Sequence, residues 1–179
     1  MKKAWIVKAW MVAMAMAALA IPLTATASVS PTDSKNAAKF CKALRAEMNA
    51  TSPTAFKDAY GTNRNHSNAY GKCVSKYARV AHANHSDAVK ACKTEQEANQ
   101  GAFTTKYGTN KHGTNAFGKC VSKQEDQAEQ ADHDAIVNAA KQCRAERAKD
   151  RDAFRKNYGT NHNKSNAFGK CVSKLSKVA

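Results

Sequence analysis

Apolar residues follow two different patterns along this chain of 179 residues. One long apolar run, from Ala9 to Leu23, lies near the N-terminus. Beyond it, apolar residues are sparse and recur every three or four positions among polar ones, as at Ile136, Ala140 and Cys143. That spacing places apolar side chains on one face of an α-helix. The pattern therefore predicts an all-α fold for the chain that follows the N-terminal run.

Three pairs of helices are predicted from segments that each contain one cysteine. The opening helices read AAKFCKALRAE, AVKACKTEQEA and AAKQCRAERAK, and their residues are mostly strong helix formers. The closing helices read NAYGKCVSK once and NAFGKCVSK twice. The apolar face of the last closing helix consists of Phe168, Cys171, Val172 and Leu175. Each pair of helices is expected to form an αα-hairpin.

A short helical turn and a polar loop are predicted between the two helices of each pair. In the third copy, Phe154 and Tyr158 are four residues apart, so their rings can meet on one side of the turn. In the first copy, Ser52-Pro53 is a good N-cap and first-turn pair. Glycine in the left-handed conformation ends a helix without steric cost, and we expect this at Gly61, Gly108 and Gly159. The caps expected for the closing helices are Ser67-Asn68, Thr114-Asn115 and Ser165-Asn166.

The same unit occurs three times, so the fold is predicted to be three tandem αα-hairpin repeats. The first cysteine of the unit recurs every 51 residues, and the spacing from tyrosine to second cysteine is thirteen in every copy. No Gly or Pro occurs between Lys72 and Gln100 or between Lys119 and Tyr158, so one helix could continue into the next repeat. Ser86-Asp87 and Asp132-His133-Asp134 are instead typical of new N-caps, and we expect a break at each. The resulting segments are a signal peptide at 1–27, a flexible N-terminal segment at 28–34, repeat 1 at 35–83, repeat 2 at 84–123, an acidic spacer at 124–133 and repeat 3 at 134–179.

The N-terminal run predicts export. Lys2 and Lys3 precede it, and Ala25-Thr26-Ala27 after it is a small-x-small cleavage pattern. We expect cleavage after Ala27 and secretion, with no stable membrane insertion afterwards. The alternative is an uncleaved N-terminal anchor, although fifteen apolar residues are short of the roughly 20 that a membrane span needs.

All six cysteines follow the predicted signal peptide, and an even number in an exported chain is typical of a disulfide framework. Repeat symmetry favours one bond within each unit, Cys41–Cys73, Cys92–Cys120 and Cys143–Cys171. The alternative is a shifted set with Cys73–Cys92, Cys120–Cys143 and Cys41–Cys171. A chain with so few large apolar residues needs such bonds, because its core is thin.

The phrase YGTN-x4-NAFGKCVSK, preceded by a basic, Ala-rich helix with a cysteine, resembles repeats of uncharacterised secreted actinobacterial proteins. The resemblance covers most of residues 37–174. It implies export and paired cysteines. It implies no activity, cofactor or catalytic residue.

Candidate chemistry is weak at the polar residues of the loops. His66, His112 and His162 lie seven, eight and nine positions before the next cysteine, so they are out of register for a repeated metal site. The sequence has no nucleophile motif, and we expect neither an enzyme nor a metal or other cofactor. The amides kept in every loop are expected to form turns, with sugar binding as the alternative; they are Asn63, Asn110 and Asn161.

Lysine pairs are the stronger functional signal. They stand at i and i+4 on the closing helices, on a face turned partly away from the cysteines and aromatic residues, at Lys72/Lys76, Lys119/Lys123 and Lys170/Lys174. Like charges at this spacing destabilise an isolated helix slightly, so helix stability does not explain the pairs. Without the signal peptide the chain has 26 basic and 14 acidic residues, a formal charge of +12, and the spacer carries four of the acidic ones. The simpler interpretation is a solubilising surface.

These observations predict a protein that binds rather than catalyses. The leading hypothesis is weak, multivalent binding of an anionic polymer, such as envelope polysaccharide, a teichoic-type phosphate polymer or extracellular DNA, through the lysine pairs. The alternative is a secreted protein-interaction module (an inhibitor, toxin or adhesion protein) that recognises a protein through the loops Thr62–Ser67, Thr109–Thr114 and Thr160–Ser165. Membrane disruption is a weaker third hypothesis, because the closing helices are short and stapled.

Overall fold

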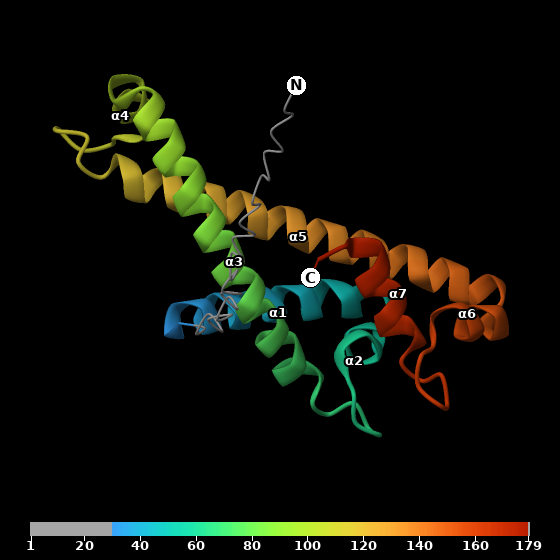
Figure 1. The fold of residues 1–179 in the computed structure, drawn as a ribbon. Coiled ribbons are helices and arrows are strands. Elements are labelled where there is room, and N and C mark those ends of the chain that lie inside the picture. The colour runs from blue at the N-terminus through green and yellow to red at the C-terminus, as the bar shows by residue number, and fades with distance from the viewer. Residues whose placement is uncertain (1–29, 179) are drawn as a thin grey trace, which may run out of the picture.

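The computed structural model describes residues 30–178, and over this range the secondary structure is entirely α-helical (Figure 1). The predicted signal peptide, residues 1–27, lies outside the described residues. The helices are α1 (Pro31–Thr51), α2 (Ala55–Tyr60), α3 (Ala69–Ala98), α4 (Gln100–Tyr107), α5 (Ala116–Lys149), α6 (Arg151–Tyr158) and α7 (Ala167–Ser176). The predicted all-α fold is therefore confirmed.

Helix α1 begins earlier than the sequence indicated. Ser30 caps it through a reciprocal box, in which the Ser30 hydroxyl accepts from the Asp33 amide at 3.1 Å and the Asp33 carboxylate accepts from the Ser30 amide at 2.9 Å. Two otherwise unpaired amides at the helix N-terminus are thereby satisfied. The prediction of a flexible segment at 28–34 is wrong for residues 31–34, which are helical.

The three disulfides join the helices as repeat symmetry predicted. Cys41–Cys73 links α1 to α3, Cys92–Cys120 links α3 to α5, and Cys143–Cys171 links α5 to α7, each with Cα atoms 6.0 Å apart. All six cysteines are fully buried. The shifted pairing is excluded, and each repeat is an opening helix, a short helix and a closing helix closed by one bond.

Adjacent repeats share a helix, which corrects the expected breaks. Ser86-Asp87 lies inside α3, and the acidic spacer 124–133, with Asp132-His133-Asp134, lies inside α5. Both helices are long, 30 and 34 residues, or roughly 45 and 50 Å. The cap signals are overridden because the flanking residues favour helix and contain neither Gly nor Pro. The spacer is therefore part of a continuous helix that joins repeats 2 and 3.

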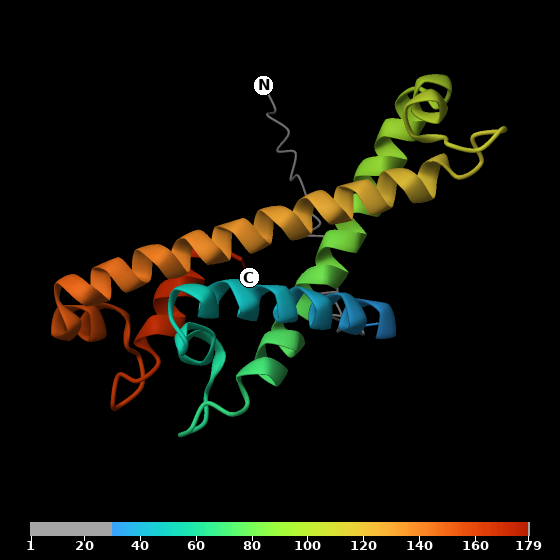
Figure 2. The same ribbon diagram turned by 180° about the vertical axis from the view of Figure 1, so that it is seen from behind.

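Two separate cores divide the molecule into a body and an arm. The body consists of α1, α2, α6, α7 and the adjoining parts of α3 and α5, and repeats 1 and 3 share its core. The arm is α4 with the parts of α3 and α5 that pack against it, and it projects from the body in both views (Figures 1 and 2). Large side chains fully buried in the body include Leu44, Met48, Phe56 and Ile136. The arm core is smaller and consists of Ala88, Cys92, Phe103, Tyr107, Ala116, Cys120 and Val121.

The glycines after the short helices are needed for space and not for a left-handed backbone, so that prediction is wrong. Their φ angles are −69°, −69° and −72° at Gly61, Gly108 and Gly159. A Cβ on Gly108 would lie 2.5 Å from the Thr104 carbonyl oxygen and 2.8 Å from the Gly113 Cα. The left-handed position comes five residues later, at His66, Gly113 and Lys164.

The repeated loop residues hold the loop together, as predicted for the asparagines. In the first copy, Asn68 accepts from the Thr62 amide at 3.0 Å and donates to the Thr62 hydroxyl at 2.8 Å. Asn63 donates to the Ser67 hydroxyl at 2.8 Å, and the other two copies repeat the pattern. Asn68 occupies the N-cap position of α3, but its side chain turns back to the loop instead of capping the helix. Ser52 does not cap α2 either, because that helix begins at Ala55 after Thr54.

Aromatic pairs pack at the centre of each repeat, as predicted. Phe154 and Tyr158 lie with ring centroids 4.9 Å apart, and the other two copies give 5.0 Å. In repeats 2 and 3, the tyrosine hydroxyl donates to a glutamate, Glu95 or Glu146. Repeat 1 has Leu44 in place of that glutamate, and its Tyr60 hydroxyl pairs with the Tyr77 hydroxyl at 3.2 Å.

The tyrosine pair of repeat 1 holds its protons tightly. Burial raises the pKa of Tyr60 to about 12, although the hydrogen bond with Tyr77 acts in the opposite direction. Burial also raises the pKa of Tyr77, and the neighbouring Tyr60 and the charge of Asp132 raise it further. The body therefore resists tyrosine ionisation while it is folded.

We expect the body to lose stability as the pH rises from about 10 towards 12. The unfolded chain releases phenolic protons near pH 10, whereas folded Tyr60 and Tyr77 retain theirs, so ionisation increasingly favours the unfolded state. Urea unfolding at about pH 8 and about pH 11 measures the difference, and Tyr60→Phe should reduce it. Equal stability at the two pH values would refute the prediction.

Candidate functional site

The three lysine pairs lie on the closing helices, and the second lysine of each covers a tyrosine. The Nζ atom of Lys76 lies 5.9 Å from the centre of the Tyr77 ring, that of Lys123 6.0 Å from Tyr107, and that of Lys174 5.6 Å from Tyr158. These distances suit cation–π attraction. The first lysine of each pair is exposed, at Lys72, Lys119 and Lys170. The second lysine of each pair thus lies against an aromatic ring, although the pairs were expected on a face turned partly away from the aromatic residues.

One lysine pair lines a basic hollow of about 600 Å³, which we call the α3 hollow. Lys72, Lys76 and Arg79 of α3 face Lys177 across it, and Asp132 of α5 is the one acidic residue in its lining. Burial lowers the pKa of Lys76, which is half-buried there. An anion in the hollow would meet four cationic groups against one carboxylate. The other two pairs lie elsewhere, Lys119 and Lys123 on the arm and Lys170 and Lys174 on α7.

Two of the four acidic residues of the spacer pair with histidine and asparagine. His85 of α3 bonds Glu125, and Asn84 donates to Asp132 at 3.1 Å. His133 lies 3.5 Å from Glu47 of α1. These contacts join α1, α3 and α5 where they cross.

The loop histidines do not converge. His66 lies 3.7 Å from Asp58 of its own repeat, and His112 and His162 are exposed in other loops. Within residues 30–178, no group of three or more His, Cys, Asp or Glu side chains could hold a metal ion.

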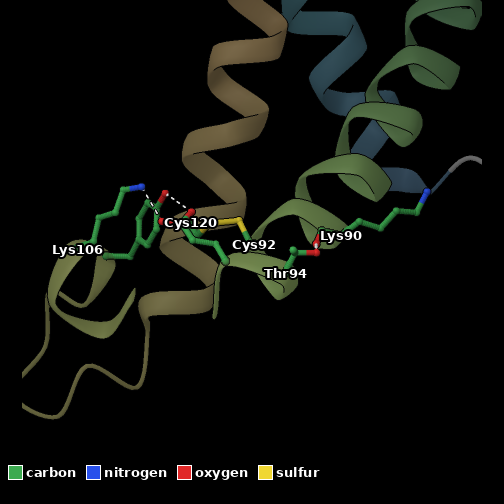
Figure 3. Close-up of a disulfide and its surroundings, with 7 residues drawn as sticks. Lys90, Cys92, Thr94, Lys106 and Cys120 are labelled. Carbon is green, nitrogen blue, oxygen red and sulfur yellow. Dashed lines mark hydrogen bonds and ion pairs between the residues drawn. A yellow bond between two sulfur atoms is a disulfide. The ribbon is translucent and has the colours of Figure 1, made fainter. Parts of the chain in front are cut away.

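The arm carries a polar cluster over its disulfide, drawn in Figure 3. Lys106 Nζ and the Tyr107 hydroxyl both donate to Glu95, at 2.6 and 3.0 Å. The hydrogen bond from Lys106 lowers the pKa of Glu95, and that from Tyr107 adds to it. Glu95 thus holds Lys106 in place, and the positive charge of Lys123 also acts on Glu95, whereas Lys119 is exposed.

A group of arginines near the end of α5 was missed by the sequence reasoning. Two adjoining hollows of about 420 and 570 Å³ share Arg147 and Arg151 in their linings. The first also contains Arg155 and Lys164, and the second contains Arg144. A sequence signal existed, because four of the seven arginines of the chain lie between residues 144 and 155.

The fold and these surfaces define an all-α, disulfide-stapled repeat protein with basic hollows on its body. No protein-family model, curated protein or solved structure matches the chain. A membrane-crossing helix needs a long apolar stretch, and none of the helices within the described residues has one.

Proposed function

We propose that this protein binds anionic polymers, such as envelope polysaccharide, teichoic-type phosphate chains or extracellular DNA, weakly and at several points. The observation that supports this most directly is the α3 hollow, where Lys72 and Lys76 meet Arg79 and Lys177 around one accessible space. Clustered cations attract a polyanion and displace its counterions, which favours binding. The protein acts in this proposal as a binding protein and not as an enzyme.

Three lysine pairs allow contacts that are individually weak to add up to useful affinity for a polymer. The body carries two lysine pairs, on α3 and α7, and the arm carries the third, so one polymer chain can engage the body and the arm. After the first contact, the others form at high effective concentration, and avidity rises without tighter individual sites.

The compartment fits this role. Three buried disulfides suggest an oxidising extracellular environment, where such bonds persist. Export through residues 1–27 is part of the proposal. Two of the four spacer carboxylates, Glu125 and Asp132, are already engaged with His85 and Asn84.

Changing all six paired lysines to glutamine is expected to abolish most of the binding. We would measure the affinity of the oxidised protein for duplex DNA and for an anionic polysaccharide across a salt series, including about 150 mM. For DNA, the slope of log affinity against log salt should fall by about 0.9 for each phosphate that the variant no longer neutralises.

A matched control removes the same charge from exposed lysines that line neither the α3 hollow nor the two hollows that share Arg147 and Arg151. Its six changes to glutamine are at Lys35, Lys42, Lys90, Lys93, Lys141 and Lys156. We expect this control to keep most of the affinity. If both variants lose affinity equally, net charge alone explains the binding. If neither wild type nor variants bind, the exposed loops Thr62–Ser67, Thr109–Thr114 and Thr160–Ser165 become the place to seek a protein partner.

A further inference from the structure

The arginines of repeat 3 form a second basic region, which we call the arginine hollow. It comprises the two adjoining spaces between the C-terminal end of α5, helix α6 and the loop that follows it. Its cationic members are Arg144, Arg147, Arg151, Arg155 and Lys164. Asp58 of α2 is the single acidic residue in either lining. This region shares no lining residue with the α3 hollow, although α5 contributes to both.

Contacts within the body hold several of these side chains in place. Arg147 Nη1 lies 3.3 Å from Asp58 Oδ2, and its guanidinium carbon lies 4.8 Å from the centre of the Phe168 ring. Arg155 donates to the carbonyl oxygen of Asn163 at 2.7 Å. Lys164 Nζ donates to the carbonyl oxygen of Gly159 at 3.0 Å. A ligand entering the hollow would meet cations that are already positioned, which lowers the entropy lost on binding.

Arg151 differs from these neighbours. It is exposed, it is the first residue of α6, and its side chain makes no hydrogen bond or ion pair with any other described residue. It nevertheless lines both spaces. Its five guanidinium N–H groups are thus available to a ligand.

The arginines also repel one another. Burial lowers the pKa of Arg144, and the positive charge of Arg147 lowers it further. Collecting like charges costs free energy in the empty protein, and an oxyanion placed between them would offset that cost.

Repeat 2 shows that the fold of the unit does not require this chemistry. It has the same cysteine spacing of 28 residues. The five positions that correspond to the cations of the arginine hollow are Lys93, Gln96, Gln100, Thr104 and Gly113. The repeat folds with one cation there, so the extra four in repeat 3 need another explanation.

We propose that the arginine hollow binds a ligand carrying two neighbouring tetrahedral oxyanion groups, as in an oligophosphate chain. A guanidinium presents paired N–H donors that match a phosphate or sulfate group bidentately, which a lysine cannot do. Two adjoining spaces that share Arg147 and Arg151 suit two adjacent groups better than one. The site is distinct from the α3 hollow and does not depend on the polymer-binding proposal.

The test is calorimetric titration of the oxidised protein with tripolyphosphate at about 150 mM salt. Arg151→Gln should weaken binding about tenfold, since it removes a charge-assisted bidentate contact. Lys149→Gln is the matched control, because it removes the same charge from an exposed residue two positions away that lines neither space. Its effect should be under about twofold. Arg151→Lys keeps the charge but removes the paired donors, and should fall between the two.

Further titrations distinguish the ligand type and the two sites. Inorganic phosphate should bind much more weakly than tripolyphosphate, and a sulfated oligosaccharide would show whether sulfate serves equally well. Lys72→Gln/Lys76→Gln should lower the affinity for tripolyphosphate much less than Arg151→Gln does, while it weakens polymer binding, so a failure of either proposal is visible separately. The assignment is overturned if wild type does not bind tripolyphosphate at millimolar concentration, if Arg151→Gln and Lys149→Gln behave alike, or if single phosphate binds as tightly.

Discussion

Replacing Cys92 and Cys120 together with alanine is expected to unfold the arm while leaving the body folded. The bond closes a loop of 29 residues, counting both cysteines, and on the chain-entropy account it contributes about 3.5 kcal/mol. The arm has little else to hold it, because only Phe103, Tyr107 and Val121 among its buried residues are large and apolar. The free energy lost with the bond should therefore be larger than the stability that the other contacts of the arm provide.

Hydrogen exchange is the measurement that resolves this outcome, because it reports local opening segment by segment. Amides of α4 and of the adjoining ends of α3 and α5 should lose protection, while those of α1 keep it. The variant lacking Cys143 and Cys171 is the control, since its bond closes a loop of equal length. There we expect lower protection throughout the body but no unfolding, because Leu44, Phe56 and Ile136 remain buried. The prediction would be contradicted if the amides of the arm stayed protected from exchange without the disulfide.

Alanine at the glycine of the closing helices is expected to have opposite effects in different repeats. A Cβ on Gly169 of α7 would lie 2.5 Å from the carbonyl oxygen of Ala59 in α2. At Gly71 and Gly118 a Cβ would meet nothing within 4 Å. Gly169→Ala should destabilise the protein by about 1–3 kcal/mol through overpacking. Gly71→Ala and Gly118→Ala should stabilise it by about 0.5–1 kcal/mol, because alanine favours helix.

Denaturant unfolding of the three variants measures this difference in sign. The two stabilising changes serve as internal controls for the third, since all three glycines occupy the same position of the same repeated phrase. Only the contact between α2 and α7, which unites repeats 1 and 3, distinguishes Gly169. If Gly169→Ala stabilises as the others do, the two repeats do not pack together in this way.

Features repeated in the sequence were the ones that sequence reasoning predicted well. The helices, the Phe–Tyr pairs and the three disulfides depend on residues close together along the chain, and three copies gave the same answer. The breaks expected at Ser86-Asp87 and Asp132-His133-Asp134 were wrong, because cap residues are only local preferences. A helix that packs against neighbours at both ends overrides them.

The errors at the glycines have a different cause. Glycine is selected either for a left-handed backbone or for close approach of other atoms, and a sequence does not distinguish the two. At Gly108 the neighbour is Gly113, which itself holds the left-handed conformation. Only the folded loop reveals which glycine does which.

Contacts between repeats could not be predicted from the repeated phrase. The sharing of one core by repeats 1 and 3 depends on how α3 and α5 cross, and no local pattern encodes that crossing. The α3 hollow likewise needs Lys177 to return beside Lys72 and Lys76. Arg144, Arg147, Arg151 and Arg155 were visible as a local concentration of arginine, but their common lining became apparent only in three dimensions.

The shared helices set the direction in which successive repeats point. Cys73 and Cys92 are 19 residues apart on α3, and Cys120 and Cys143 are 23 residues apart on α5. An α-helix turns by about 100° per residue. Around the axis of α3, the directions of its two disulfides therefore differ by about 100°, and around the axis of α5 they differ by about 140°. One residue inserted between the two cysteines of either helix would rotate the arm by about another 100°. Because α3 and α5 both enter the arm, both helices would need the insertion. Seven residues added to each would extend the arm by about 10 Å and almost restore its heading. In a protein assembled from this unit, the direction of each repeat therefore depends on the lengths of the two helices that it shares with its neighbours. Its shape can change only when both lengths change together, by whole residues.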